Sequence, residues 1–573
     1  MDNAILDKAK AWLSDDFDTD TQKKVQDLID NDPKELEEVF YKNLEFGTGG
    51  MRGIMGVGIN RLNQYTLGMA TQGLARYLKK QLPNNKQIKV AITHDVRNNS
   101  TEFAKIVANI LSANGIKVFL TDGFRATPIL SFAVRHYNCD AGIVLTASHN
   151  PPEYNGYKVY WSDGAQIVPP HDHGIIHEVN HTKVNDILFH GNDELIECVG
   201  DELDQAFIQA SISHISKDKT GFENVKIVFT SIHGTAIKTT PLALEKAGFT
   251  DVHIVQEQST PDPYFSTVKS PNPEEPEALK MAIDLANEID ADIVIGTDPD
   301  ADRLGIAVRD FDGKMTLLNG NQSNVVLTHY LLQKWEKEGK INGNQFIGST
   351  IVTSDVFFDL AKEYKVTCKA GLTGFKWIGK MIHDAEGKED FIGGGEESFG
   401  YMVGDFVRDK DSITATLLAC EIAAVAKLNG SSFYNELAQA YTKVGCYQEH
   451  LISLVKKGLD GAEQIKNIMI QLRENPLTEI LGAKVIRIDD YQSSISKNRL
   501  TGAETDLTIP KSNVLIYYTE DGTKIAARPS GTEPKIKFYF SVKDNLNQAK
   551  DFPEVQKKLK EKIEQIILEM KLD

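Results

Sequence analysis

The sequence predicts an α/β protein with three similar mixed α/β sandwich domains followed by a C-terminal α+β domain. Short β-rich apolar runs at residues 88–96, 225–233 and 344–352 are each followed by a helical pattern and a second strand. Alternation of strand and helix on this scale is typical of parallel strands joined by crossover helices. Residues 513–542 instead alternate apolar and polar residues around polar turns, which is typical of an antiparallel sheet.

The individual elements follow from local signals along the chain. Residues up to about 42 have the period of a helical extension, and the helices of the first two units end at Gly115 and Gly248. The third such helix ends near residues 363–364, residues 451–482 are expected to be helix and linker, and a last helix is expected over residues 551–571. The expected organisation is a helical extension and four domains, at residues 1–42, 43–205, 206–318, 319–445 and 446–573.

Composition and charge exclude several classes of protein. Of the 573 residues, 41% are hydrophobic and 25% are charged, as in globular proteins rather than disordered or fibrous ones. With 63 Lys+Arg and 81 Asp+Glu the formal charge is −18, which argues against nucleic acid as a partner but allows a small anionic substrate. No apolar run reaches the roughly 18 residues of a membrane span, so no membrane partner is expected.

The cysteines and the first residues indicate a cytoplasmic protein. Five cysteines are scattered along the chain without a C-x-x-C pair, so neither a disulfide framework nor a zinc site is expected. The first residues are acidic and have a helical period, and no signal peptide is visible among them.

A serine follows the apolar run AGIVL in the segment TASHNPPEYNGYK, residues 146–158. Ser148 is flanked by Ala147, His149 and Asn150 and is followed by two prolines, so its loop is expected to be held in place. One interpretation is a plain polar turn, and the other is a nucleophile or a carrier of phosphate. The segment is not the G-x-S-x-G elbow of α/β-hydrolases, because neither glycine is present.

Three aspartates alternate along GTDPDADR, residues 296–303, directly after the strand ADIVI. Asp298, Asp300 and Asp302 repel one another unless a cation lies between them, and hard oxygen ligands favour Mg²⁺. The segment is not an EF-hand, because Arg303 stands where the glycine of that loop should be. A solvated acidic loop and a phosphatase with an aspartate nucleophile stay open as alternatives.

Three glycine-containing segments complete the set. GGGEESFGY, residues 393–401, offers two carboxylates and a hydroxyl that can bond sugar hydroxyls. RPSGTEPK, residues 528–535, combines a guanidinium, hydroxyls and backbone amides, which suits a phosphate dianion. FGTGGMRG, residues 46–53, is neither a Walker loop nor G-x-G-x-x-G, so nucleotide binding of these types is unsupported. GGGEESFGY and RPSGTEPK can each alone be an ordinary turn. Together with the serine and the aspartates, these two segments indicate phosphoryl chemistry on a polyol.

The motifs TASHNPP, DPDADR, GGEESFG and RPSGTEP, in this order, resemble those of the α-D-phosphohexomutases over nearly the whole chain. GEESFG is more similar to the phosphoglucomutases of that family than to its phosphomannomutase or phosphoglucosamine mutase types. The metal loop departs from many relatives at Pro299 and Ala301, where they carry glycines. The N-terminal extension resembles the branch that also contains phosphopentomutases. This resemblance implies four domains around a central active-site cleft.

The resemblance also implies roles for individual residues. The implied catalytic residues are the phosphoserine and four neighbours: Ser148, Lys410, Lys158, Arg52 and His149. The implied ligands of one Mg²⁺ are Ser148, through a phosphoryl oxygen, and Asp298, Asp300 and Asp302. The implied substrate-binding residues are Arg303, Thr373, Gly374, Lys376, Glu396, Ser398, Arg528, Ser530, Gly531 and Thr532.

The activity that the resemblance implies is interconversion of α-D-glucose 1-phosphate and glucose 6-phosphate through a phosphoserine enzyme. Glucose 1,6-bisphosphate would serve as activator and intermediate. The expected partner is a small phosphosugar, and the chain is expected to be a monomer, with a homodimer possible. A phosphopentomutase, a phosphomannomutase, a phosphosugar phosphatase and a non-enzymatic sugar-phosphate sensor are the alternatives.

Overall fold

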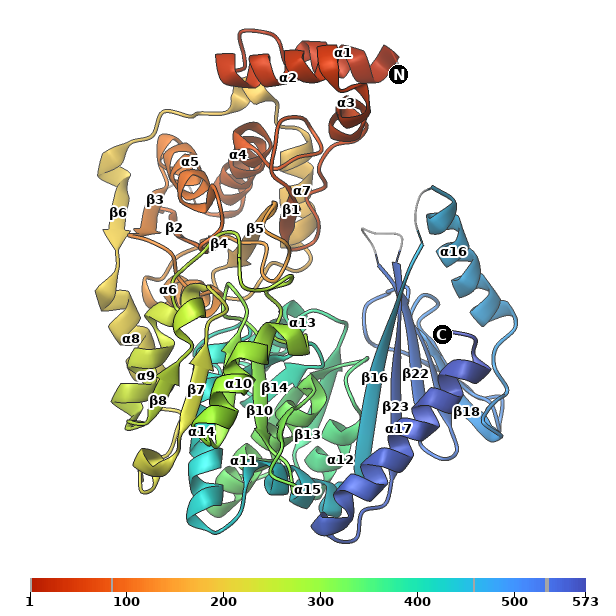
Figure 1. Cartoon of the computed structure of the whole chain (residues 1–573). Helices are drawn as coiled ribbons and strands as arrows, with labels where there is room; N and C mark the ends of the chain where they lie inside the picture. Colours follow the sequence, from red (N-terminus) through yellow and green to blue (C-terminus); the bar gives the residue numbers. More distant parts are fainter. Residues whose placement is uncertain (1–2, 84–85, 457–458, 531–534, 573) are drawn as a thin grey trace.

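Four β-sheets follow one another along the chain in the computed structural model (Figure 1). The structure describes residues 3–83, 86–456, 459–530 and 535–572. Three sheets contain parallel strands connected through helices, and the fourth is antiparallel. The predicted fold class, three α/β domains and a C-terminal α+β domain, is confirmed, whereas the limits drawn for the individual domains stay a prediction.

The first three sheets share one strand order. In each, the first strand of the unit pairs in parallel with the second and third strands, and an antiparallel strand lies beside the third. These strands are β2 (Lys89–His94), β3 (Lys117–Thr121), β4 (Ala141–Leu145) and β5 (Tyr154–Trp161) in the first sheet, β7 (Ile227–Thr230), β8 (Val252–Ile254), β9 (Ile293–Thr297) and β10 (Leu304–Arg309) in the second, and β12 (Gln345–Thr350), β13 (Thr367–Gly371), β14 (Asp390–Glu396) and β15 (Gly400–Val403) in the third. One architecture is therefore used three times.

Further strands complete the sheets. The edge strands are β1 (Gly50–Ile54) and β6 (Ile196–Val199) in the first sheet and β11 (Met315–Leu317) in the second. The fourth sheet contains β16 (Cys446–Val455), β17 (Glu479–Ile480), β18 (Ala483–Asp490), β19 (Ile495–Asn498), β20 (Glu504–Asp506), β21 (Leu515–Thr519), β22 (Lys524–Pro529) and β23 (Lys535–Asp544).

The helices of the first three domains are α4 (Gln64–Gln81), α5 (Ser100–Ala113), α6 (Thr127–His136), α7 (His171–Asn180), α8 (Asp201–Ile212), α9 (Thr240–Ala247), α10 (Lys280–Glu288), α11 (Gly320–Lys337), α12 (Val356–Glu363), α13 (Lys376–Ala385), α14 (Ser412–Leu428) and α15 (Phe433–Val444). The fourth domain contains α16 (Leu459–Glu474) and α17 (Phe552–Glu569). Helices α5 and α9 end before Gly115 and Gly248, whose positive φ angles of 77° and 109° suit glycine. The predicted ends of these helices are confirmed.

The N-terminal extension consists of helices α1 (Asn3–Ala11), α2 (Thr19–Asn31) and α3 (Pro33–Phe40), which lie against the first domain (Figure 1). The side chains of Asp18 and Asp32 accept hydrogen bonds from the first backbone amides of α2 and α3, which fixes where these helices begin. Trp12 and Phe40 pack with Tyr65 of α4 in one apolar cluster. The predicted helical extension is therefore confirmed, and it is anchored by aromatic packing.

The prediction of helix and linker over residues 451–482 was wrong at its start. Residues 446–455 form the ten-residue strand β16, which pairs with β23 along its whole length. Ile452 and Leu454 on this strand pack against the main apolar core, while their neighbours Leu451 and Val455 are exposed. This alternation is the period of a half-buried strand, and it outweighs the helical propensity of the surrounding segment.

The ends of the third strands bring the polar segments of different domains together. The loop between β9 and β10 receives a hydrogen bond from the first residue of α6, where Thr127 N donates to Asp300 O over 2.8 Å. The same loop pairs with the β14–β15 loop, because Leu304 N donates to Phe399 O over 2.9 Å. The fourth domain is attached to the third by Lys524, whose ammonium donates to Asp355 Oδ1 over 2.6 Å.

Within the described parts of the chain, no single helix has both the length and the apolar composition to cross a bilayer. Helices α14 and α15 have that length and composition only when taken together, and they are bent by 91° relative to each other.

Replacement of Phe40 by alanine should loosen the N-terminal helices. Phe40 is fully buried and contacts Trp12 edge to face, so its loss leaves a cavity that costs about 3–5 kcal/mol. We expect Phe40→Ala to lower the first thermal unfolding transition and to expose the extension to proteolysis. The neighbouring Tyr41 is 48% exposed, so Tyr41→Ala is the matched control and should change little. Equal behaviour of the two variants would contradict the packing role.

Candidate active site

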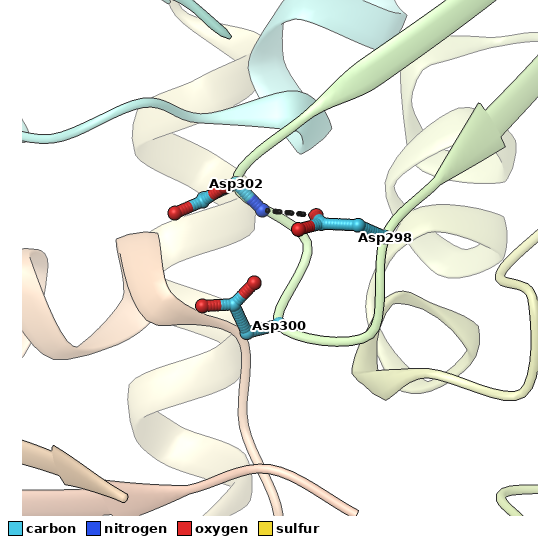
Figure 2. A group of neighbouring side chains, drawn as sticks. All are labelled: Asp298, Asp300 and Asp302. Carbon is cyan, nitrogen blue, oxygen red and sulfur yellow. Dashed lines mark hydrogen bonds between the residues drawn. The ribbon is translucent and has the colours of Figure 1, made fainter. Parts of the chain in front are cut away.

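The three aspartates lie on the tight loop between β9 and β10 (Figure 2). All three side chains are buried, and Ala301 between them adopts a positive φ of 55° that turns the chain sharply. Asp298 Oδ1 accepts the backbone amides of Asp302 and Arg303 over 3.1 and 3.0 Å. The first aspartate thus organises the backbone that carries the third.

The aspartate triad has the donor set of a cation site. One carboxylate oxygen from each aspartate lies within 4.8 Å of the others. Asp300 Oδ1 and Asp302 Oδ1 are buried and have no hydrogen-bond partner among the described residues. A buried, unpartnered carboxylate oxygen is costly, and a hard divalent cation such as Mg²⁺ would satisfy several at once. The residues present therefore fit a metal ion.

The electrostatics of the triad are strongly asymmetric. Burial and the charges of Asp300 and Asp302 raise the pKa of Asp298 well above its usual value. Burial also opposes ionisation of Asp300, but the Lys158 ammonium and hydrogen bonds outweigh it and hold the pKa of Asp300 below its usual value. One carboxylate thus takes up a proton more readily than its neighbour.

Ser148 lies against the aspartate triad, on the loop between β4 and β5. Its Oγ donates to Asp298 Oδ2 over 2.9 Å, and His149 Nδ1 lies 3.2 Å from the same Oγ. The φ angle of Ser148 is 53°, a strained value for a residue with a side chain, and its amide donates to Thr146 Oγ1 over 2.8 Å. Burial, with the nearby Arg303 and Arg52, lowers the pKa of His149 well below its usual value, so this imidazole is neutral at physiological pH.

A buried guanidinium that sequence analysis missed holds the serine loop. Arg97 donates to the carbonyl oxygens of Ser148, Pro151 and Tyr154 over 2.8, 2.7 and 3.0 Å, and also to that of Asn150. It lies directly after β2, at the same end of the sheet as Ser148 after β4. The carboxyl ends of parallel strands share one edge, and this rule could have singled out Arg97.

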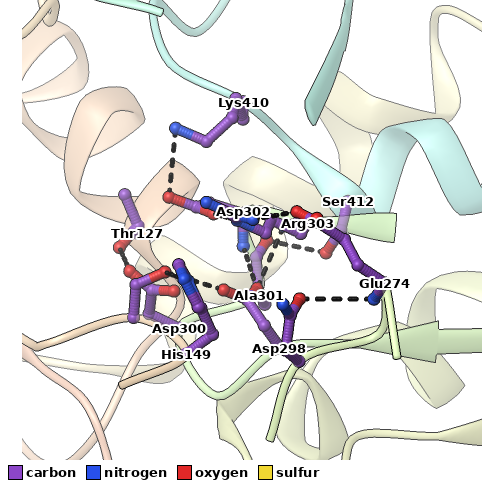
Figure 3. A network of polar contacts seen from close by, with 12 residues as sticks. Thr127, His149, Glu274, Asp298, Asp300, Ala301, Asp302, Arg303, Lys410 and Ser412 are labelled. Carbon is purple, nitrogen blue, oxygen red and sulfur yellow. Dashed lines mark hydrogen bonds and ion pairs between the residues drawn. The ribbon is translucent and has the colours of Figure 1, made fainter. Parts of the chain in front are cut away.

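Two lysines from different domains bring positive charge to the triad, and Figure 3 labels one of them, Lys410. Lys158 on β5 lies 2.8 Å from Asp300 Oδ2 and 3.5 Å from Asp302 Oδ2. Lys410, in the loop before α14, lies 3.2 Å from Asp302 Oδ2 and 3.9 Å from Glu396 Oε1. Burial lowers the pKa of each ammonium, but the surrounding carboxylates outweigh it and raise both pKa values. Both lysines are therefore protonated here.

Several residues missed by sequence analysis join the loops of different domains (Figure 3). Thr127 Oγ1 donates to Asp300 Oδ2 over 2.9 Å, and Ser412 Oγ donates to Ala301 O over 2.6 Å. Arg303 forms an ion pair with Glu274. The hydroxyls stand at the first positions of α6 and α14, where no metal or nucleophile pattern marks them in the sequence.

The β14–β15 loop presents its two glutamates differently. Glu396 is buried beside Lys410, and burial raises its pKa above the usual value. Glu397 Oε2 accepts the Thr353 hydroxyl over 3.0 Å, so this carboxylate is tied to the end of β12. Ser398, between Glu397 and Phe399, is half-buried.

The remaining predicted site residues surround this centre at greater separation. Arg52, exposed on β1, donates to Asn150 Oδ1 over 3.1 Å. Thr373 and Gly374 form the turn before α13, and Lys376 at the start of that helix donates to Thr48 Oγ1 over 2.7 Å. The latter contact joins the third domain to the first.

The predicted phosphate clamp is described in part. Arg528 is on β22, and Ser530 follows it with a backbone hydrogen bond to Lys535 O of 2.7 Å. Gly531 and Thr532 lie outside the described residues. The structure thus brings Ser148, His149, the three aspartates, Lys158, Lys410, Arg303 and Glu396 into one contact network, and places the other predicted residues around it.

Comparison with known proteins gives the same picture along the chain. The family descriptions "Phosphoglucomutase/phosphomannomutase, alpha/beta/alpha domain" I, II and III match residues 43–186, 205–313 and 319–441. A protein named phosphoglucomutase from Staphylococcus aureus (strain MRSA252) is 40% identical, covering 92% of this chain and 93% of that protein. A Staphylococcus epidermidis protein of the same name is also 40% identical, with 90% and 94% covered.

Solved structures with this fold are also known. A putative phosphomannomutase from Thermus thermophilus has a TM-score of 0.69 at 21% identity, covering 92% of this chain and 99% of that one. The open form of the Paramecium phosphoprotein parafusin has a TM-score of 0.65 at 19% identity, with 92% and 96% covered. These two structures show that the fold is shared. The sequence matches show in addition that the chain is related to the named family. The chain belongs to the phosphoglucomutase/phosphomannomutase family.

Proposed function

We propose that the protein is a phosphoglucomutase, which interconverts α-D-glucose 1-phosphate and glucose 6-phosphate through a phosphorylated Ser148 and glucose 1,6-bisphosphate. The observation that carries this proposal is the 2.9 Å contact between Ser148 Oγ and Asp298 in a buried aspartate triad. The relatives named phosphoglucomutase, 40% identical over most of the chain, support glucose as the sugar.

Asp298, Asp300 and Asp302, with a phosphoryl oxygen on Ser148, would hold one Mg²⁺, which would neutralise charge on the transferring phosphoryl group. Phosphorylation of Ser148 removes the hydroxyl hydrogen that Asp298 Oδ2 accepts in this structure. Asp298 Oδ2 then needs a new partner, and it lies beside two further unpartnered oxygens of the triad. Loading the serine and filling the aspartate site are therefore coupled.

Proton transfer can be assigned to groups around Ser148. When the phosphoryl group leaves Ser148 Oγ and later returns, that oxygen gains and then loses a proton. His149 Nδ1 lies within hydrogen-bond distance and is neutral, so it can accept this proton on return. In that same step the sugar oxygen that loses the phosphoryl group gains a proton, which protonated Lys410 Nζ can donate. Transfer in the other direction reverses both proton steps: neutral Lys410 takes the proton of the attacking sugar hydroxyl, and protonated His149 returns one to Ser148 Oγ. Lys158 adds a second positive charge.

The outer residues would bind and orient the sugar phosphate. We assign Glu396 and Ser398 to the sugar hydroxyls, and Arg528 with the loop after it to the phosphate that is not being transferred. Arg303, Arg52 and the turn at Thr373, Gly374 and Lys376 would surround the reacting end. Because the bisphosphate must return in the opposite orientation, both ends of the sugar use the same two phosphate sites.

We also infer the setting of this activity. The five cysteines are free, and three of them are buried, which fits the reducing cytoplasm.

Every group assigned above belongs to one chain, so we propose that a monomer suffices for turnover.

Ser148→Ala should abolish mutase turnover while the fold persists, because one hydroxyl is removed from a loop held by Arg97. The intact mass of the purified wild type should include one phosphoryl group that maps to Ser148, and the variant should lack it. Ser213→Ala, at an exposed serine, is the control and should keep full activity. Normal turnover by folded Ser148→Ala would rule out the phosphoserine.

Arg97→Met should lower kcat by about 100-fold with a smaller change in KM. The guanidinium fixes four carbonyls of the loop that aims Ser148, and displacement of a reacting group by about 1 Å costs about that factor. Arg309 is a matched control, because it also donates to three backbone carbonyls but lies at the far end of β10. Folded Arg309→Met should keep its kcat; an equal loss in both variants would refute the positioning role of Arg97.

Glucose 1-phosphate should be preferred over mannose 1-phosphate and ribose 1-phosphate. Glu396 and Ser398 can bond adjacent equatorial hydroxyls, and an axial hydroxyl would leave the buried Glu396 carboxylate short of a partner. An unmade hydrogen bond to a charged group costs about 1.5–3 kcal/mol, or roughly 10- to 150-fold in kcat/KM. Steady-state assays with each sugar and its matching bisphosphate test this. A higher kcat/KM for ribose 1-phosphate would overturn the sugar and leave the phosphoserine standing.

A further inference from the structure

Histidines are concentrated in one short stretch of the first domain. Five of the 14 histidines of the chain lie within 20 residues, at His171, His173, His177, His181 and His190. Helix α7 carries the first three of them, and His181 is the residue at its C-terminal end. Because residues four apart lie one above the other on a helix, His177 and His181 face the same side of α7.

The rings of His177 and His181 form a close pair. Their centroids lie 4.3 Å apart, with 32° between the ring planes. Both residues are exposed, and the side chain of His177 is 66% accessible to solvent. His173, one turn earlier, makes no ring contact with His177 in the part of the chain that the structure describes. The close pair therefore consists of His177 and His181 alone.

Each ring of the pair has its Nδ1 beside an acceptor oxygen. His181 Nδ1 lies 2.7 Å from the carbonyl oxygen of His177, so this nitrogen carries a hydrogen and donates it. His177 Nδ1 lies 3.5 Å from Glu178 Oε1, a carboxylate oxygen that also accepts from Lys80. In each neutral imidazole the lone pair is then on Nε2, which has no protein partner among the described residues. Histidines that bind metals typically have their other ring nitrogen held in this way, by a backbone carbonyl or a carboxylate.

We propose that His177 and His181 bind one late first-row divalent ion, of the Zn²⁺, Ni²⁺ and Cu²⁺ class, through their Nε2 atoms. Water would fill the remaining coordination positions. Imidazole nitrogen is a preferred ligand of these ions, whereas an all-oxygen set such as the aspartate triad favours Mg²⁺. Two metal–nitrogen bonds of about 2.1 Å span at most about 4.2 Å between the nitrogens, which is comparable with the spacing of the two rings.

The surroundings of the pair favour a cation. The last carbonyl groups of α7 give this end of the helix a partial negative charge, and His177 and His181 are both in its last turn or directly after it. The Lys80 ammonium is offset by Glu178, which it contacts over 2.6 Å. The formal charge of −18 on the whole chain adds a general attraction for cations.

A bound ion would strengthen the contact between the first domain and the N-terminal extension. His181 is followed directly by residues 182–189, of which Val184 and Phe189 pack against the apolar cluster of the extension. Coordination by His177 and His181 would fix the end of α7 from which this segment departs. No contact joins the pair to the active-site network in the described parts of the chain, so the ion would leave the aspartate triad unchanged.

The test is calorimetric titration of Ni²⁺ into the untagged full chain, with excess Mg²⁺ present to occupy the aspartate triad. We expect the pair to bind one Ni²⁺ per chain. His177→Ala and His181→Ala should each raise the Kd by at least roughly 10- to 100-fold, the loss that removal of even an outer partner of a metal ligand causes. The matched control is His173→Ala, an exposed histidine of the same helix four residues before His177, which should stay within a few-fold of the parent.

Thermal unfolding gives a second readout. An ion that binds the folded chain and not the unfolded one stabilises the folded state, so Ni²⁺ should raise the first unfolding transition of the parent and of His173→Ala. The same addition should leave that transition unchanged in His177→Ala and His181→Ala. Mutase turnover with Mg²⁺ should be equal in the parent and in all three variants, which also shows that each variant is folded.

Three results would overturn the proposal. They are the absence of Ni²⁺ binding in the parent, an unchanged Kd in His177→Ala or His181→Ala, and a loss of affinity that is equal in His173→Ala. The titration needs no turnover, so its outcome is independent of the mutase function proposed above. A wild type without mutase turnover that still binds Ni²⁺ through His177 and His181 would refute the mutase and keep the metal site.

Discussion

Three buried carboxylates within 4.8 Å of one another set the main constraint on this structure. Their mutual repulsion in a poorly solvated place must be offset, and the chain offsets it from three directions. Asp298 bonds two backbone amides and the Ser148 hydroxyl, Asp300 meets Lys158, and Asp302 meets Lys410. These partners come from different domains. The repulsion between the aspartates is therefore offset only when the domains are correctly placed relative to one another.

The repeated strand order explains how one chain can meet that constraint. In each unit the third strand and its antiparallel neighbour are connected by a loop at the same edge of the sheet. The serine, the aspartates and the glutamates are on these three equivalent loops. The units pack with those edges inward, which brings the serine, the aspartates and the glutamates together. Backbone hydrogen bonds, such as that from Leu304 N to Phe399 O, connect the loops directly. The repeated strand order thus determines where the three loops lie, and the sequences of the loops determine their chemical groups.

Much of this could be predicted from the sequence, because the signals are local. Residues close together along the chain mark several of these features. They mark the three β–α units, the glycines that end α5 and α9, and the polar segments after buried strands. The start of β16 was missed because its alternation is visible only when the partner strand β23 and the helices beneath it are known. Arg97, Thr127 and Ser412 were missed because their partners are 51 to 173 residues away in sequence. Their importance is a property of the assembled loops, and single-sequence patterns do not contain it.

The N-terminal helices have a consequence for how the protein is made. Their apolar cluster includes Tyr65 on α4, and Val184 and Phe189 from beyond α7 pack against it. During synthesis the first 42 residues leave the ribosome long before residue 189 exists, so the apolar faces of α1 to α3 lack part of their cover in that interval. These helices are therefore synthesised well before their apolar cover is complete. Until residue 189 is made, the apolar faces of these three helices need protection from premature association.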